Sequence, residues 1–234
     1  MMLEKVPRWE SELWSYISSS DGEHCPLHYD CQVRLQDHRC LNDSKRHLQH
    51  INTLLDNDEF ILGGSGADKL DFIRCAEAGR IFQLVEKLAH KYLKMGNLHS
   101  PPVPAVLVAL CDKTPIEVRE VPLKAYHGAI WRLRNSWIIH LNENDTPARK
   151  KFSLFHEAFH ILAHSKATPV FRKIGFKQGS FNELLADHFA GCILMPPEWA
   201  REKWAEVHDL DQMAEIFQIP KPVVWFGLKG MGLI

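Results

Sequence analysis

The order of hydrophobic and polar positions predicts helices followed by a small sheet in the middle of the chain. Apolar side chains recur every three or four positions over residues 68–92, which predicts an amphipathic helix with Asp68 as its N-cap. A short apolar run at 105–111 follows several prolines and predicts a second, short helix. Period-two alternation at 116–121 and a strand, turn and strand pattern at 128–140 then predict a small antiparallel sheet.

The pattern becomes helical again after the sheet. One helix is predicted from Thr146 to about Ala163, and another from about Phe181 to Leu194, where Met195-Pro196-Pro197 ends it. Helices that are separate in sequence from a short run of strands are typical of the α+β class. We therefore expect an α+β fold in which two helices follow a small sheet.

The chain divides into three predicted parts. Residues 1–66 are polar, rich in His and Cys, and end in the Gly63-Gly64-Ser65-Gly66 run, which favours a flexible linker. Residues 67–206 contain the predicted sheet and helices, and residues 207–234 form a short carboxy-terminal region.

Composition and charge exclude several classes of protein. The chain has 234 residues, of which 45% are hydrophobic and 24% charged, as in a globular domain. Its formal net charge of −1 offers no overall attraction to nucleic acid or to anionic membranes. No apolar run reaches the roughly 18 residues that a membrane helix needs, and charged residues near the start argue against a secretory signal, so we expect a cytoplasmic protein. Fourteen histidines direct attention to metal sites.

The first candidate metal motif is His156-Glu157-Ala158-Phe159-His160, an H-E-x-x-H sequence within a predicted helix. Residues four apart lie one turn apart on the same face, so His156 and His160 can share one tetrahedral ion. Glu157 lies beside them and can take a proton from a water molecule that the ion activates. This is the chemistry of peptide-bond hydrolysis.

A third ligand is predicted on the next helix. Glu183 and Asp187 are also four residues apart, so Glu183 can complete a His2Glu site while Asp187 accepts a hydrogen bond from the outer nitrogen of a ligand histidine. Residue types alone leave open whether the ion is zinc, manganese or another divalent cation. The competing interpretation, that His156, His160 and Glu183 are surface or capping residues, leaves polar groups without a purpose on apolar helices.

Other polar residues near the motif have less defined roles. His164 continues the four-residue series, but its spacing does not match that of the metzincins, and we interpret it as a residue at the end of the helix. Four side chains are candidates for stabilising the oxyanion that forms during hydrolysis, and the sequence does not choose among them: Tyr126, His127, Arg149 and His188.

The H-E-x-x-H sequence followed by N-E-x-x-x-D resembles the gluzincin metallopeptidases, and residues 68–200 resemble the catalytic domain of the ImmA/IrrE family in particular. The residues that carry this resemblance are Arg149, Lys151–His160, Glu183, Ala186–Ala190 and Leu194–Pro196, with Pro102–Pro104, Ile116–Val118 and Ile138–Asn142 upstream. The chain departs from the family pattern at Phe155, where Ala is usual, and at Ala158-Phe159, where Leu-Gly is usual.

The resemblance implies a zincin-like fold and a zinc-dependent endopeptidase. Its substrate would be a helix-turn-helix (XRE-type) transcriptional repressor, cleaved to relieve repression in a stress or mobile-element response. By motif match, His156, His160 and Glu183 would bind the catalytic zinc, and Glu157 would be the base. The alternative is a non-catalytic regulator with a metal-stabilised fold that binds a repressor or nucleic acid.

The resemblance also implies a helix-turn-helix-like region at the carboxy terminus. Residues 210–233 look like a degenerate version, with two apolar stripes on either side of a turn at Gln218-Ile219-Pro220. Only Lys221 and Lys229 are basic in its second helix, so we expect packing or partner binding and not direct recognition of nucleic acid.

The amino-terminal part contains a second candidate metal site. Five potential ligands lie within sixteen residues, and three thiolates with one imidazole would complete a tetrahedral structural zinc site: Cys25, His28, Cys31, His38 and Cys40. The spacing leaves open which histidine joins, with His24 and His47 as further candidates. An iron–sulfur cluster, a redox-sensing thiol group and free cysteines are the alternatives.

Overall fold

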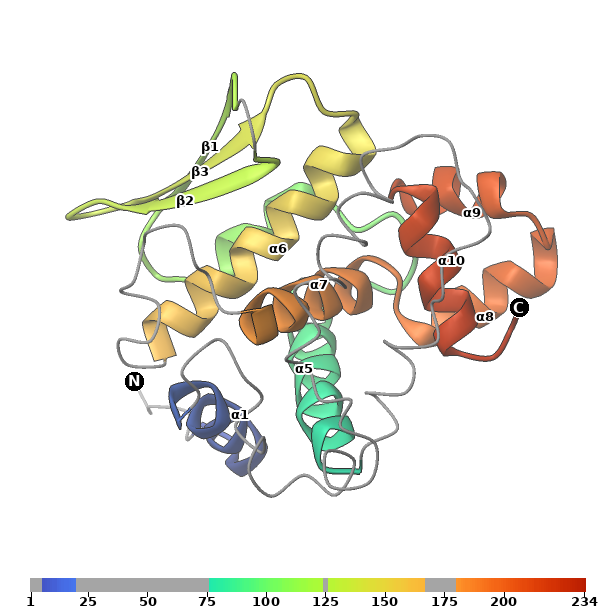
Figure 1. Ribbon diagram of the computed structural model, residues 1–234, viewed down its shortest axis with the longest axis horizontal. Helices are drawn as coiled ribbons and strands as arrows, with labels where there is room; N and C mark the ends of the chain where they lie inside the picture. Colours follow the sequence, from blue (N-terminus) through green and yellow to red (C-terminus); the bar gives the residue numbers. More distant parts are fainter. Residues whose placement is uncertain (1–5, 20–75, 124–125, 167–179) are drawn as a thin grey trace.

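The computed structural model describes residues 6–19, 76–123, 126–166 and 180–234 (Figure 1). In chain order its elements are α1 (Arg8–Ser19), α5 (Ala76–Met95), the 3-10 helix η2 (Ala105–Leu110), β1 (Ile116–Val121), β2 (Gly128–Arg132), β3 (Trp137–Asn142), α6 (Pro147–Lys166), α7 (Ser180–Leu194), α8 (Pro197–Val207), α9 (Leu210–Phe217) and α10 (Lys221–Gly230). The fold is therefore mixed α+β, with a small sheet and a majority of helices. None of the helices in the described ranges is both long and apolar enough to cross a membrane.

The helices predicted around the sheet are confirmed where the structure describes them. The described part of the first begins at Ala76, so Asp68 and its N-cap role lie outside the described residues. The short apolar run forms a 3-10 helix, and α6 and α7 cover the two helical segments predicted after the sheet. Pro197, expected only to end a helix, also begins α8, because proline lacks an N–H that the first turn would leave unpaired anyway.

The sheet differs from the antiparallel arrangement that the alternation predicted. Its strand order is β1-β3-β2: β2 pairs antiparallel with β3, whereas β1 pairs parallel with β3, with Ile116 opposite Trp137. The chain reverses direction between β1 and β2, but these two strands are not neighbours. Strand β3 runs between them and pairs with both. The prediction of a purely antiparallel sheet was wrong in this respect.

Burial explains why β3 takes the central place. Its residues Trp137, Ile138, Ile139 and Leu141 are buried, whereas most residues of β1 are exposed. A central strand has both backbone edges paired and its apolar side chains covered, so the most hydrophobic strand gains most from that position. Alternation in sequence identifies strands and reversals but not their order in space.

Helix α6 lies between the sheet and the other helices (Figure 1). It contacts β2 and β3 on one side and packs along α7 on the other, and α7 in turn packs along α5. Residues all around the middle of α6 are therefore buried, among them Phe155, Ala158, Phe159 and Leu162, each fully inaccessible to solvent.

Helix α1 belongs to the same hydrophobic core, although it falls within the range 1–66 predicted as a separate module. Leu13 and Ile17 are fully buried and form part of the continuous cluster that includes α5 and α6. Trp14 lies 6.5 Å, between ring centroids, from Phe159, the bulky residue that stands where the family pattern has Gly. The aromatic side chain at this position of α6 thus contacts α1. The predicted division into three parts stays a prediction.

A partly buried ion pair also joins α1 to α5. Glu10 is only 2% exposed, and its carboxylate lies 2.7 Å from Lys91 Nζ. Breaking such a pair by removing one partner leaves an uncompensated buried charge, which is strongly destabilising. This contact fixes the position of α1 along α5.

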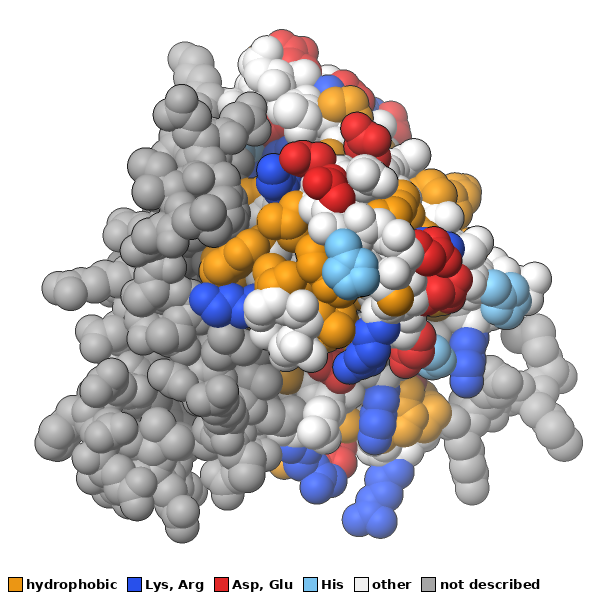
Figure 2. Space-filling view, turned by 90° about the vertical axis from the view of Figure 1, so that its right-hand side faces the viewer, with side chains coloured by type: hydrophobic (Ala, Val, Ile, Leu, Met, Phe, Trp, Pro, Cys, Tyr) orange, Lys and Arg blue, Asp and Glu red, His pale blue; other side chains and the backbone are white. Residues whose placement is uncertain are grey.

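The three carboxy-terminal helices form the opposite side of the molecule. Figure 2 views this side, where hydrophobic side chains gather between acidic and basic ones. Helices α9 and α10 pack on each other and bury Met213, Phe217, Val224 and Leu228. The predicted pair of helices with a short turn between them is present, while a helix-turn-helix role for it stays a prediction.

The place of α1 in the core yields a first prediction. Ile17→Ala lowers the free energy of unfolding by about 2–5 kcal/mol, because it leaves a cavity against the α5 side of the core. Ser15→Ala on the exposed face of α1 changes it by less than about 0.5 kcal/mol. Urea denaturation of the full chain measures both values, and equal stabilities of the two variants would show that α1 does not contribute to the core.

Candidate metal centre

Three of the predicted ligands converge at the crossing of α6 and α7. His156 and His160 stand one turn apart on α6, and Glu183 reaches them from the first turn of α7. One ligand atom from each lies within 4.8 Å of the others. The side chain of His160 is almost fully buried, while those of His156 and Glu183 keep 16% and 19% of their surface exposed, so the group opens to solvent on one side.

The separations within this group suit a tetrahedral zinc ion. The two Nε2 atoms of the histidines are 3.2 Å apart, and each lies 3.2 Å from an oxygen of Glu183. Zinc bonds of about 2.0–2.1 Å at tetrahedral angles place two nitrogen ligands about 3.4 Å apart. Both imidazoles direct the same nitrogen at a common point, as ligands of one ion do. The donor set therefore fits zinc, with a fourth position for water or substrate.

Asp187 contacts the outer imidazole nitrogen of His156. Its Oδ1 lies 2.8 Å from Nδ1 of His156, so Nδ1 donates its proton to Asp187, and the neutral form of the imidazole that would bind an ion presents its lone pair at Nε2. Burial lowers the pKa of His156, but its hydrogen bonds to Asp187 and Glu183 outweigh burial and raise the pKa well above its usual value. The predicted hydrogen bond between Asp187 and a histidine of the H-E-x-x-H motif is therefore present in the structure.

Glu183 is held in its charged form. Burial alone would raise its pKa, but the charge of His160 and hydrogen bonds from His156 and His160 lower it far below the usual range of a carboxyl group. A carboxylate that stays ionised is the form that binds a cation.

Glu157 follows His156 on α6 and is not one of the three converging residues. It is 7% exposed, and burial raises its pKa, opposed in part by the neighbouring charges of His156 and His160. A carboxyl group whose pKa is raised toward neutrality is suited to accept a proton and return it. Its position next to the ligand set is the position that a general base requires.

Gly128 is the residue that sequence reasoning missed. It begins β2, the edge strand that faces α6, and a Cβ atom built on it would lie 2.7 Å from Oε1 of Glu157. Any larger residue would displace that carboxylate. A glycine inside a strand pattern often marks the close approach of another group, which is the signal that could have found it.

The candidates for stabilising an oxyanion lie in different places. Tyr126 is 57% exposed, and His127, just before β2, directs Nδ1 to Asp145 Oδ2 at 2.8 Å. Arg149 is buried near the start of α6, with its guanidinium over the ring of Phe152.

Of the other predicted histidines, His188 does not join the candidate metal centre. His188 lies on the side of α7 that faces α5, where it contacts Glu86 and Cys192. His164 lies in the last turn of α6, as expected for a residue at a helix end. The amino-terminal set of Cys25, His28, Cys31, His38 and Cys40, with His24 and His47, lies outside the described residues.

A small sheet over a helix that carries H-E-x-x-H, with a glutamate supplied by the following helix, is the arrangement of a zincin-like metallopeptidase domain. The model of one peptidase family, Peptidase_M78 or the IrrE N-terminal-like domain, matches residues 111–229, and the chain belongs to this family. The resemblance found in the sequence is thereby confirmed.

Comparison with solved structures shows a similar fold in a Mycobacterium tuberculosis transcriptional regulator, with a TM-score of 0.50 and 12% sequence identity. The similarity covers 69% of this chain and 48% of the regulator, so the chain spans about half the length of that protein. At this level of identity the similarity concerns the fold. Comparison with curated proteins gave no match.

The contact between Asp187 and His156 yields a second prediction. Asp187→Asn lowers the affinity for zinc by about 10–100-fold, because the imidazole loses the partner that fixes its tautomer and raises its basicity. Asp145→Asn is the matched control, since it removes a carboxylate at the same 2.8 Å distance from His127, which is not a ligand. Competition with a zinc-binding dye measures both affinities, and similar affinities in the two variants would contradict the assigned role.

Proposed function

We propose that the protein is a zinc-dependent endopeptidase in which His156, His160 and Glu183 hold the ion and Glu157 is the catalytic base. The buried carboxylate of Glu157 beside the three converging ligands carries this proposal, since a purely structural zinc site has no use for it. Membership of a peptidase family supports the same conclusion.

Each residue has a defined part in hydrolysis. A zinc ion held by His156, His160 and Glu183 would supply Lewis acidity toward the scissile carbonyl and the attacking water. Glu157 accepts the proton of the attacking water and delivers it to the leaving amine, a role to which its raised pKa is suited. Asp187 keeps His156 in the tautomer that presents Nε2, and Gly128 leaves room for the Glu157 carboxylate.

The proposed substrate is a protein, namely a helix-turn-helix transcriptional repressor encoded nearby, and its cleavage would relieve repression in a stress or mobile-element response. The resemblance to the ImmA/IrrE family supports this choice. Direct nucleic-acid binding by the carboxy-terminal helices is not part of the proposal. Lys221 of α10 is paired with Asp211 at 2.8 Å, and Lys229 lies over the ring of Trp225, so both basic groups of α10 have partners within the protein.

Replacement of the base gives the central prediction. Glu157→Gln reduces the rate of repressor cleavage by about 10²–10⁴-fold, because the amide cannot accept the proton. The variant keeps its zinc, since Glu157 is not among the converging ligands. Mass spectrometry of the repressor fragments gives the rate, and elemental analysis gives the zinc content.

Glu215→Gln serves as the control, because it removes a carboxylate from the exposed face of α9 and leaves cleavage unchanged. Cleavage by Glu157→Gln at the wild-type rate would overturn the assignment of the base. Tight binding of an intact repressor by the zinc-loaded wild type, without cleavage, would instead favour the non-catalytic regulator.

The close approach of Gly128 to Glu157 gives a further prediction. Gly128→Ala moves the Glu157 carboxylate, since the new methyl group would lie 2.7 Å from Oε1, and we expect kcat to fall at least about tenfold. Because the displaced atoms end a flexible side chain, folding and zinc content are retained. Gly230→Ala, whose Cβ meets nothing within 4 Å, is the control. An unchanged kcat in Gly128→Ala would show that the position of the carboxylate does not limit the reaction.

A further inference from the structure

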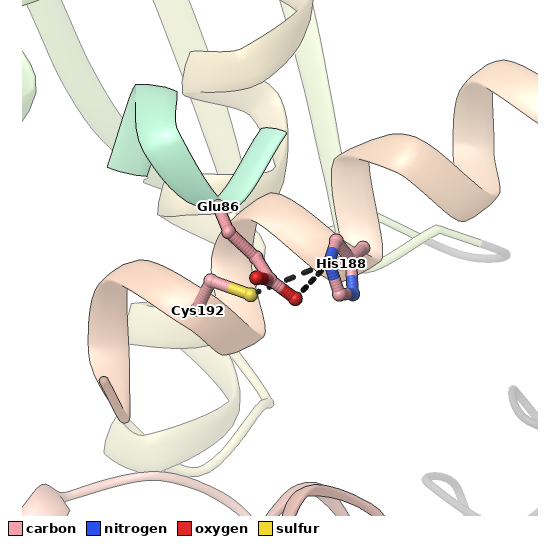
Figure 3. Close-up of side chains that lie close together, drawn as sticks. All are labelled: Glu86, His188 and Cys192. Carbon is pink, nitrogen blue, oxygen red and sulfur yellow. Dashed lines mark hydrogen bonds and ion pairs between the residues drawn. The ribbon is translucent and has the colours of Figure 1, made fainter. Parts of the chain in front are cut away.

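A second group of metal-binding side chains lies between α5 and α7, on a different side of α7 from the candidate catalytic ligands. His188 and Cys192 are one turn apart on α7, and Glu86 reaches them from α5. Figure 3 shows the three side chains directed toward one another. As in the first group, one ligand atom from each lies within 4.8 Å of the others.

The distances in this group are those that ligands of a shared ion would have, and the N-to-O distance is longer than an ordinary hydrogen bond. Nε2 of His188 is 3.5 Å from Sγ of Cys192 and 3.4 Å from Oε1 of Glu86. Zinc bonds of about 2.3 Å to sulfur and about 2.0–2.2 Å to nitrogen and oxygen, at tetrahedral angles, place S and N about 3.6 Å apart and N and O about 3.4 Å apart. Hydrogen bonds from N–H to oxygen are shorter, at about 2.9–3.0 Å.

The imidazole that joins the other two ligands is held in place and can be reached from solvent. The buried ring of Phe82 meets His188 edge to face, with ring centroids 4.7 Å apart, and fixes the plane of the imidazole. The side chain of His188 is 14% exposed and that of Glu86 is 46% exposed. Glu86 and Cys192 also line a surface pocket of about 660 Å³, which gives an ion a path to the site.

We propose that Glu86, His188 and Cys192 form a second zinc site. A thiolate, an imidazole and a carboxylate are all zinc ligands, and together they favour a borderline-soft ion such as zinc over magnesium or calcium, which prefer oxygen. Three protein ligands leave the fourth position to water or to a donor that enters through the pocket. The ion ties α5 to α7, the helix that also supplies Glu183. The site does not depend on whether the protein hydrolyses peptides.

Zinc content of the full chain tests this proposal with variants matched in pairs. Cys192→Ser and Glu86→Ala each remove one ligand. Their controls are Gly191→Ala, next to Cys192 and with nothing within 4 Å of the new Cβ, and Glu198→Ala, which removes a carboxylate from the same pocket. Each protein is equilibrated with zinc against a chelator and its zinc is counted by elemental analysis, while circular dichroism checks that it is folded.

We expect Cys192→Ser and Glu86→Ala each to bind one zinc fewer per chain than the wild type, and both controls to match the wild type. We expect His156→Ala also to bind one zinc fewer, and the double variant His156→Ala, Cys192→Ser to bind two fewer. This additivity separates the second site from the proposed catalytic site without any activity assay. The cobalt-loaded wild type also shows thiolate-to-cobalt absorption, and we expect this absorption to be weaker in Cys192→Ser. Equal zinc content and equal cobalt spectra in wild type and both ligand variants would overturn the proposal, as would a loss that does not add to that of His156→Ala.

Discussion

The crossing of α6 and α7 is the constraint on which the candidate metal centre depends. Two imidazoles on one helix can meet a carboxylate on another only where the helices touch at a fixed register. Apolar side chains supply that register, because Phe159 of α6 and Phe189 of α7 are fully buried and their ring centroids lie 5.5 Å apart. Helix α5 packs on the other side of α7, and α1 adds Trp14 against Phe159. The core thus supports polar groups whose burial would be costly without a shared partner.

The sheet contributes to the site through one edge. Because β3 is the most hydrophobic strand and takes the centre, β2 is left as the edge strand that contacts α6. Gly128 at the start of β2 then comes so close to Glu157 that only a glycine leaves the carboxylate where it is. The proposed base is positioned by its own helix and by the absence of a side chain on a neighbouring strand.

Helix α7 presents ligand pairs in two directions. Glu183 and Asp187 face α6, while His188 and Cys192 face α5. Five residues separate Glu183 from His188, which corresponds to about 140° around a helix. A single helix between two others can therefore contribute to two ion sites with four-residue spacing in each. Both sites would restrain α7, from opposite neighbours.

The sequence by itself determined most of the helices and strands, the peptidase family, the shared face of His156 and His160, and that of Glu183 and Asp187, because four-residue spacing on a helix is a local property that survives in any tertiary context. Only the tertiary structure decided the strand order, the packing of α1 into the core, the approach of Gly128 to Glu157 and the meeting of Glu86 with His188 and Cys192. Each of these depends on contacts between segments far apart in the chain. Those contacts are set by the burial of whole faces, and local periodicity does not say which faces meet or how far apart their residues lie.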